Sequence, residues 1–241
     1  MKTIGHIHTD FPSKFGIPRQ SGLIPELKGT IIFEPEYRNP EAFRGLEEFS
    51  HIWILWKFSK SEKEHWSATV KPPRLGGKKR MGVFATRSPY RPNDIGLSSV
   101  RLEKITYDTK TGPVLHVAGA DLMDGTPIYD IKPYITYADS HPEATEGFAG
   151  KVKEKELLVD FPEELLKKYP EEKRPAIVGV LKQDPRPAYD TDETRVYGVE
   201  FAGYDVRFTV AGDLLTVKEL LKLNETKERS HIYGDKSGSI I

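Results

Sequence analysis

Hydrophobic and polar residues alternate along much of the first 140 positions, a pattern typical of β-strands with one buried face. Turn-rich pieces such as DTKTG and LMDG separate these segments, and their spacing favours a sheet that closes into a barrel or packs as a sandwich. A short helix is expected at 40–46, because Asn39 can cap it and Pro40 suits its first position. The strands that the pattern predicts are 29–34, 49–58, 81–86, 97–106, 113–120 and 127–136.

The second part of the chain mixes helical and strand patterns. A helix is expected at 162–168, with acidic residues in its first turn and basic residues in its last. Another helix is expected at 217–223, opened by the capping box Thr216-x-x-Glu219. The strands predicted here are 176–181, 195–201 and 204–210.

These patterns predict a mainly β chain with two domains. A small, partly open β-barrel domain is expected in residues 1–145 and a small α+β domain in 146–224, followed by a polar tail at 225–241. The polar, glycine-bearing segment 140–156 is the expected connection. The chain contains no GxGxxG turn, no GxxxxGK[ST] loop and no HExxH helix, which excludes a Rossmann nucleotide site, a P-loop and a zincin.

Composition narrows the classes of function further. The 36 basic and 36 acidic residues cancel, so any affinity for nucleic acid depends on local clusters. There is no cysteine, which excludes disulfides and thiolate nucleophiles. No metal site is expected, since His6 and His8 lack nearby cysteines or a second histidine pair. Without an apolar signal core or a membrane-spanning run, we expect a soluble, cytoplasmic protein with no membrane partner.

Two neighbouring segments could bind an anion or RNA. In FATRSPYRPNDIGLS, two prolines stiffen a loop that presents Arg87 and Arg91, although a surface turn with solvated arginines is an alternative. The run KPPRLGGKKR at 71–80 carries five basic residues and no acid, and it could neutralise several phosphates or be a solvated loop. Both segments adjoin the predicted strand 81–86, whose six residues would span about 20 Å, so both could flank one RNA-binding surface.

Two further stretches carry polar groups that suit a ligand. FGIPRQSG places Arg19 and Gln20 after a proline, which offers a cation and an amide to polar ligand edges. DLMDGTPIYDIKPY contains the Asp124-Gly125 turn, which is either a simple hairpin or a close approach of backbone to a ligand.

Four motifs together resemble the TsaA/TrmO family of tRNA methyltransferases: PRQ at 18–20, MGVFATRSPYRPNDIGLSSVRL at 81–102, DLMDGTPIYDIKPYI at 121–135 and DPRPAYDTDETRVYGVEFAGYDVRF at 184–208. The resemblance implies a small β-barrel that uses S-adenosylmethionine to methylate N6 of a threonylcarbamoyl-modified adenosine next to the tRNA anticodon. It also implies a homodimer with the cofactor near the subunit interface.

The resemblance assigns roles to individual residues of this chain. Ser59 stands where relatives often have histidine, and Asp94 where the family usually has a second proline. The implied cofactor contacts are Pro18, Arg19, Gln20, Ser59, Lys60, Arg87, Leu97, Asp124, Gly125, Thr126 and Pro127. The candidates for RNA contact are Lys71, Arg74, Lys78, Lys79, Arg80, Arg91, Arg186, Tyr189 and Arg207, with the second domain expected to recognise tRNA.

Methyl transfer from a sulfonium requires alignment and removal of one proton, and no covalent nucleophile. Tyr129 and Asp130 follow the cofactor motif and are the candidates for that proton transfer, while a structural hydrogen-bonding role is equally open for both. Two other functions remain alternatives: a non-catalytic barrel that binds tRNA, and a methyltransferase of this fold with a different acceptor.

Overall fold

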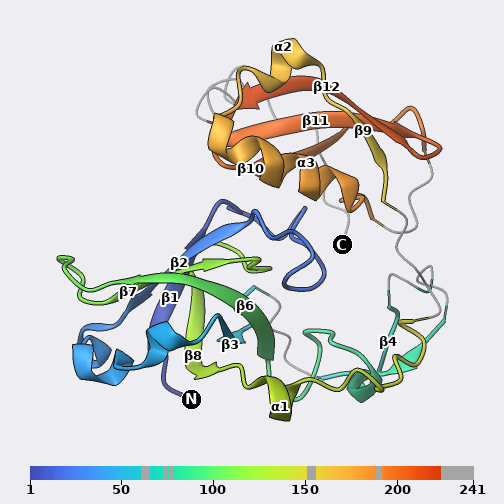
Figure 1. The fold of residues 1–241 in the computed structure, drawn as a ribbon. Coiled ribbons are helices and arrows are strands. Elements are labelled where there is room, and N and C mark those ends of the chain that lie inside the picture. The colour runs from blue at the N-terminus through green and yellow to red at the C-terminus, as the bar shows by residue number, and fades with distance from the viewer. Residues whose placement is uncertain (61–65, 73–74, 76–78, 151–155, 188–191, 224–241) are drawn as a thin grey trace.

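The computed structural model describes residues 1–60, 66–72, 75, 79–150, 156–187 and 192–223. In Figure 1 a barrel built from the first half of the chain lies beside a smaller sheet that carries helices. The predicted polar tail at 225–241 lies outside the described residues. No helix in the described ranges is long and apolar enough to cross a membrane.

Within the described residues, six strands close the barrel, and each pairs with its neighbours in antiparallel fashion. Alternate side chains of these strands point inward and form one core, in which Ile7, Ile31, Ile54 and Leu115 are fully buried. The predicted small β-barrel is confirmed, and it is closed. In barrel order, the strands are β1 (Gly5–Thr9), β2 (Lys28–Phe33), β7 (Val114–Ala118), β6 (Ile95–Thr106), β3 (His51–Lys57) and β8 (Thr126–Pro133).

The helix predicted at 40–46 is two separate 3-10 helices, η2 (Pro40–Phe43) and η3 (Leu46–Glu48). Asn39 caps η2 as predicted, because its side chain accepts a hydrogen bond from the Glu41 N–H at 3.1 Å. Gly45 then takes a left-handed φ of 83°, which ends the helical path between the two. Another 3-10 helix, η1 (Pro35–Tyr37), precedes them, and the short helix α1 (Thr136–Asp139) follows β8.

The predicted strand 81–86 is wrong beyond its first two residues. Only β5 (Met81–Gly82) pairs, with β4 (Thr69–Val70), and the chain then turns into the 3-10 helix η5 (Val83–Ala85). The reason is local, since Val83 is buried and its N–H donates to the Ala68 carbonyl at 3.0 Å. The expectation that a six-residue strand separates the basic run from the arginine loop is therefore wrong as well.

The second sheet has the order β10-β11-β12-β9, and the prediction of a small α+β region is confirmed. The segment predicted as a strand at 176–181 lies in helix α3, where buried residues fall on one helical face. The segment predicted as a helix at 217–223 lies almost wholly in β12, which pairs with β11. The elements are β9 (Leu158–Asp160), α2 (Glu163–Leu166), η6 (Glu171–Lys173), α3 (Arg174–Lys182), β10 (Tyr197–Phe201), β11 (Tyr204–Ala211) and β12 (Leu214–Lys222).

The segment between β1 and β2 joins the two halves of the protein. Phe11, Ile24 and Leu27 are buried in the core of the second sheet and not in the barrel core. The Ala202 N–H donates to the Asp10 carbonyl at 3.0 Å. Figure 1 shows this blue segment reaching from the barrel toward α3. The β1–β2 segment, defined here as residues 10–27, is therefore held by the second core.

Candidate functional site

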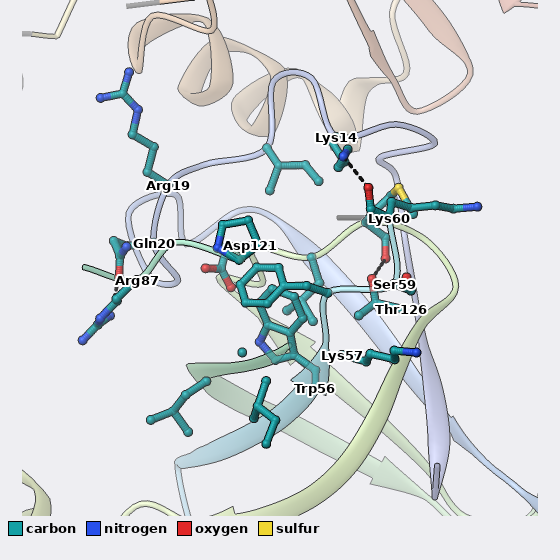
Figure 2. A pocket seen from close by; sticks show the side chains of 18 of the residues that line it. Lys14, Arg19, Gln20, Trp56, Lys57, Ser59, Lys60, Arg87, Asp121 and Thr126 are labelled. Atoms are coloured by element: carbon teal, nitrogen blue, oxygen red, sulfur yellow. Dashed lines mark hydrogen bonds between the residues drawn. The ribbon is translucent and has the colours of Figure 1, made fainter. Parts of the chain in front are cut away.

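A pocket of about 450 Å³ lies at one end of the barrel (Figure 2). The β1–β2 segment, the end of β3, the loop that leads into β6 and the β7–β8 connection form its walls. The residues that line it are Lys14, Ile17, Pro18, Arg19, Gln20, Trp56, Lys57, Phe58, Ser59, Lys60, Thr86, Arg87, Pro89, Arg91, Ile95, Gly96, Leu97, Asp121, Leu122, Met123 and Thr126.

Most of the predicted cofactor residues meet in this pocket, although four separate parts of the sequence supply them. They come from the β1–β2 segment, the end of β3, the loop before β6 with the start of that strand, and the β7–β8 connection. The predicted residues that line the pocket are Pro18, Arg19, Gln20, Ser59, Lys60, Arg87, Leu97 and Thr126.

The other three predicted cofactor residues, Asp124, Gly125 and Pro127, do not line the pocket. The Asp124 carboxylate accepts a hydrogen bond from the Thr9 N–H at 3.1 Å and lies 3.2 Å from Nδ1 of His8. The N–H of Gly125, whose φ is 73°, donates to the Ile7 carbonyl at 2.9 Å. The Asp-Gly turn therefore ties the end of the β7–β8 connection to β1.

Hydrogen bonds reinforce the arginine loop that the prolines make stiff. The Arg91 guanidinium donates to the Thr86 carbonyl at 2.8 Å, and the Thr86 hydroxyl donates to the Val83 carbonyl at 2.8 Å. Asp94, which stands where the resemblance expects proline, lies 3.8 Å from the Lys57 ammonium. The carbonyl of Asp94 also accepts from the Phe58 N–H at 2.9 Å. The loop is thus fastened to the end of β3.

The β1–β2 segment is fixed to the pocket on two sides. The Arg87 guanidinium donates to the side-chain oxygen of Gln20. Across the pocket, the Lys14 ammonium donates to the Lys60 carbonyl at 2.6 Å, as Figure 2 shows. Arg19 extends away from Asp121, toward the ribbon of the second domain. Gln20 and Arg87, both predicted as cofactor contacts, therefore form a pair at the pocket wall.

Asp121 is a pocket residue that sequence reasoning missed. The Ser98 hydroxyl donates to Oδ1 of Asp121 at 2.6 Å, and the Trp56 indole N–H donates to Ser98 Oγ at 3.0 Å. Burial raises the pKa of the Asp121 carboxyl above its ordinary value, and the Ser98 hydrogen bond and the Arg87 charge oppose that rise. A signal was present, because a carboxylate between buried Ala120 and Leu122 is unusual.

The two residues predicted as candidates for proton transfer lie outside the pocket lining. Tyr129 and Asp130 belong to β8. One carboxylate oxygen of Asp130 lies 2.9 Å from the Lys132 ammonium, and the other accepts from the Ile131 N–H at 3.0 Å. The structure thus gives Asp130 a local structural role.

Several candidate RNA-binding arginines bind neighbouring groups of the protein. Arg80 donates to the hydroxyl and the carbonyl of Thr69, at 2.7 and 2.9 Å. Arg186 makes two bonds of 2.8 Å to the Asp184 carboxylate, and Arg207 lies 3.1 Å from Asp205. Lys71 and Lys79 are exposed. The remaining candidates, Arg74, Lys78 and Tyr189, lie outside the described residues.

The histidines of β1 face carboxylates. His6 lies 3.1 Å from a Glu34 oxygen, and His8 contacts Asp124 as described above. In the described part of the chain, no group of three histidine, cysteine, aspartate or glutamate side chains could hold a metal ion.

Sequence comparison relates most of the chain to one family. The family model for the tRNA-methyltransferase O N-terminal domain matches residues 6–140, and that for the TrmO C-terminal domain matches residues 154–223. A tRNA (adenine(37)-N6)-methyltransferase from Escherichia coli is 43% identical over 216 residues, which cover 86% of this chain and 91% of the relative. A Pseudomonas aeruginosa protein named as a candidate S-adenosylmethionine-dependent methyltransferase, RcsF, is 41% identical over 213 residues, which cover 85% and 90%.

Structural comparison agrees. The crystal structure of TrmO from Pseudomonas aeruginosa superposes with a TM-score of 0.71 at 34% sequence identity, covering 90% of this chain and 96% of that one. The resemblance inferred from the four sequence motifs is confirmed by both domain matches. The chain therefore belongs to the tRNA-methyltransferase O family.

Proposed function

We propose that this chain transfers a methyl group from S-adenosylmethionine to the exocyclic N6 of adenosine 37 in tRNA. Membership of the methyltransferase family supports the reaction, and the names of the relatives support the acceptor and the donor. The observation that carries the proposal is the convergence of predicted cofactor residues from four distant segments in one pocket. Convergence of this kind is characteristic of a built binding site.

The residues of the pocket fit the chemical parts of S-adenosylmethionine. When bound, this cofactor supplies an electrophilic methyl group on a sulfonium. Trp56, Phe58 and Leu97 offer apolar surface for its adenine, and the Arg87 guanidinium suits its carboxylate. A Cβ at position 96 would lie 2.3 Å from the Trp56 ring, so Gly96 is what allows the indole to occupy this wall. The volume of about 450 Å³ is also within the range of small-molecule sites.

The contribution of the protein to the reaction is mainly alignment. Displacement at a methyl carbon needs the acceptor, the carbon and the leaving sulfur in line, and a rigid pocket supplies that order in advance. Barrel strands and hydrogen-bonded connecting segments carry the lining residues, so little ordering is required on binding. Adenosine 37 lies in a single-stranded loop, where a base leaves its stack at low energetic cost.

We further propose that the acceptor is the threonylcarbamoyl-modified form of this adenosine, as the resemblance implies. The charge of the pocket supports an anionic group on the substrate. Within the described residues, the lining contains one carboxylate, Asp121, and six cationic side chains: Lys14, Arg19, Lys57, Lys60, Arg87 and Arg91. A cationic cofactor alone does not account for so many cations, whereas a modified adenosine with its own carboxylate would be stabilised by them.

We also propose that the second domain contributes to tRNA recognition, that the chain acts as a homodimer and that it acts in the cytoplasm. Leu97 lines the pocket and is 52% exposed, so a second subunit could cover it. Light scattering during size-exclusion chromatography tests the homodimer, and a monomer at micromolar concentration contradicts it.

One experiment separates these proposals from the alternatives. The protein is incubated with methyl-labelled S-adenosylmethionine and with each of two bulk tRNA preparations, both of which lack the N6 methyl group. The first preparation contains the threonylcarbamoyl group and the second lacks it. We expect label only in the first preparation, at the modified adenosine 37. Label in both preparations contradicts the modified acceptor, label at another nucleoside contradicts the site, and cofactor binding without transfer contradicts the reaction.

A further inference from the structure

Asp121 places a carboxyl group in the pocket lining, and the binding of a cofactor does not by itself require such a group there. Among the described residues, it is the one lining side chain that carries a carboxyl group. Every other titratable lining residue is a lysine or arginine, a side chain that offers hydrogen-bond donors and no acceptor. In Figure 2 Asp121 lies between Gln20 and Trp56.

The carboxylate is held by two strands of the barrel. Ser98 of β6 is 1% exposed and donates to Oδ1 of Asp121 at 2.6 Å, while Trp56 of β3 donates to the same hydroxyl at 3.0 Å. Both strands belong to the closed barrel, so the chain of hydrogen bonds fixes the orientation of the carboxylate. Such fixed support is what a group needs in order to meet a reacting atom repeatedly in one geometry.

We infer that Asp121 is the catalytic residue that accepts the proton lost by N6 of the adenosine. This role rests on the proposed function. As the bond from N6 to the methyl carbon forms, the carbon–sulfur bond breaks and its electron pair stays on sulfur, which becomes neutral. The N6 proton moves to the Asp121 carboxylate and is later released to solvent. Charge balances, because one positive sulfonium and one negative carboxylate are both neutralised.

The electrostatic environment agrees with this assignment. Burial raises the pKa of Asp121, which makes its carboxylate a stronger base than an ordinary aspartate. The charged group that acts on it is Arg87, from the loop before β6, and the neutral groups are Ser98 and the Ser21 backbone. Arg87 and the Ser98 hydrogen bond both favour the charged form and oppose this rise.

Asp121→Asn is the informative variant, because its amide oxygen can still accept the Ser98 hydrogen bond. The readouts are single-turnover methylation of tRNA at saturating cofactor from pH 5 to 9, the calorimetric affinity for S-adenosylmethionine, and thermal melting. We expect the rate to fall by about 100-fold or more, while folding and cofactor affinity stay close to wild type. Asp108→Asn, in an exposed turn outside the pocket lining, is the matched control and should match wild type throughout.

An NMR titration and the pH dependence of the wild-type rate test the same role without relying only on the activity of Asp121→Asn. Carbon NMR of labelled aspartates in the cofactor-free protein should show one carboxyl that titrates above the others and is missing in Asp121→Asn. The wild-type rate should fall as the pH drops through that titration. Ser98→Ala removes the hydrogen bond that stabilises the charged form, so it should move the inflection to higher pH.

The outcomes separate the two proposals. Wild-type methylation together with an equally active Asp121→Asn overturns the proton-acceptor role and leaves the proposed function standing. If Asp121→Asn is slow at low cofactor concentration but reaches the wild-type rate at saturating cofactor, the role is overturned as well, because Asp121 is then a binding residue. A pH inflection that Ser98→Ala does not move contradicts it too. A wild-type protein that binds the cofactor and methylates no tRNA overturns the proposed function and this role together.

Discussion

Phe11 packs against Phe201 with ring centroids 4.8 Å apart, and this contact anchors the start of the β1–β2 segment in the core of the second domain. The Lys173 ammonium lies 2.5 Å from the Asp10 carboxylate and reinforces the same junction. A few residues further on, the segment supplies Pro18, Arg19 and Gln20 to the pocket. The geometry of the pocket therefore depends on how the second domain holds this segment.

Gly16→Ala tests that dependence. Gly16 has a φ of +84°, and a Cβ there would lie 2.2 Å from a methyl carbon of Val199 in the second domain. Gly22 is in the same segment with a φ of +78°, but a Cβ there would meet no atom within 4 Å. Both alanine variants carry the cost of a left-handed residue, about 1–2 kcal/mol, so the difference between them reports the clash. We expect Gly16→Ala to bind S-adenosylmethionine about tenfold more weakly than Gly22→Ala by calorimetry. Equal affinities would show that the second domain does not shape the pocket.

Arg87→Ala should separate binding from stability. Arg87 is exposed and its guanidinium bonds to Gln20 at the pocket wall. We expect cofactor binding to weaken by about 1–3 kcal/mol, because a charged ligand group loses its partner. The melting temperature should change little. Arg44→Ala is the control, since Arg44 is also exposed and bonds to Glu41 but does not line the pocket. An Arg87→Ala protein that melts early and binds normally contradicts the binding role.

The barrel strands could be predicted because alternation of buried and exposed residues is a local signal. The strand predicted at 49–58 is observed as β3 (His51–Lys57), and the strand predicted at 97–106 is observed as β6 (Ile95–Thr106). The helix predicted at 217–223 failed because a capping box is also a local signal, and pairing with another strand outweighed it. Glu219 of that box pairs in register with Arg207 of β11, and their side chains lie 3.5 Å apart.

Some residues of the candidate site could be predicted from the sequence and others could not. Arg87 and Leu97 could be predicted as site residues because the motif that contains them is long and distinctive, and both line the pocket. Asp121 could not, although it stands at the head of another such motif. Its importance comes from Ser98, which is 23 residues away in sequence, and from burial that only the closed barrel provides. The apolar neighbours Ala120 and Leu122 mark Asp121 as an unusual carboxylate, but the sequence pattern does not show which distant strand supports it.

Tyr169→Phe should change how stability depends on pH. The Tyr169 hydroxyl donates to the Phe201 carbonyl at 2.7 Å, and the residue is 1% exposed. Burial raises the pKa of Tyr169 well above that of an unfolded tyrosine, near 10. Its contribution to stability is therefore complete below pH 10 and is lost as the pH rises above 10, since the unfolded chain releases a proton that the folded chain keeps.

Urea unfolding from pH 8 to 11 should show a steeper alkaline loss of stability for wild type than for Tyr169→Phe. At pH 8 the variant should be less stable by about 1–3 kcal/mol, because the Phe201 carbonyl loses its buried donor. Parallel pH curves would contradict this account.

The basic run next to β4 and β5 allows a direct test of RNA contact. Lys71 and Lys79 are exposed at its two ends, whereas Arg80 donates to Thr69 and would disturb the local structure if it were removed. If both lysines neutralise phosphates, Lys71→Ala/Lys79→Ala should weaken tRNA binding and leave cofactor affinity unchanged. The slope of log affinity against log salt should then become shallower by about 0.7–0.9 for each phosphate that is no longer neutralised.

Lys104→Ala/Lys110→Ala is the control for net charge alone, because it removes the same charge from exposed positions in β6 and in the turn that follows it. An equal change of slope in the two double variants would mean that tRNA senses the total charge of the protein and does not contact this run.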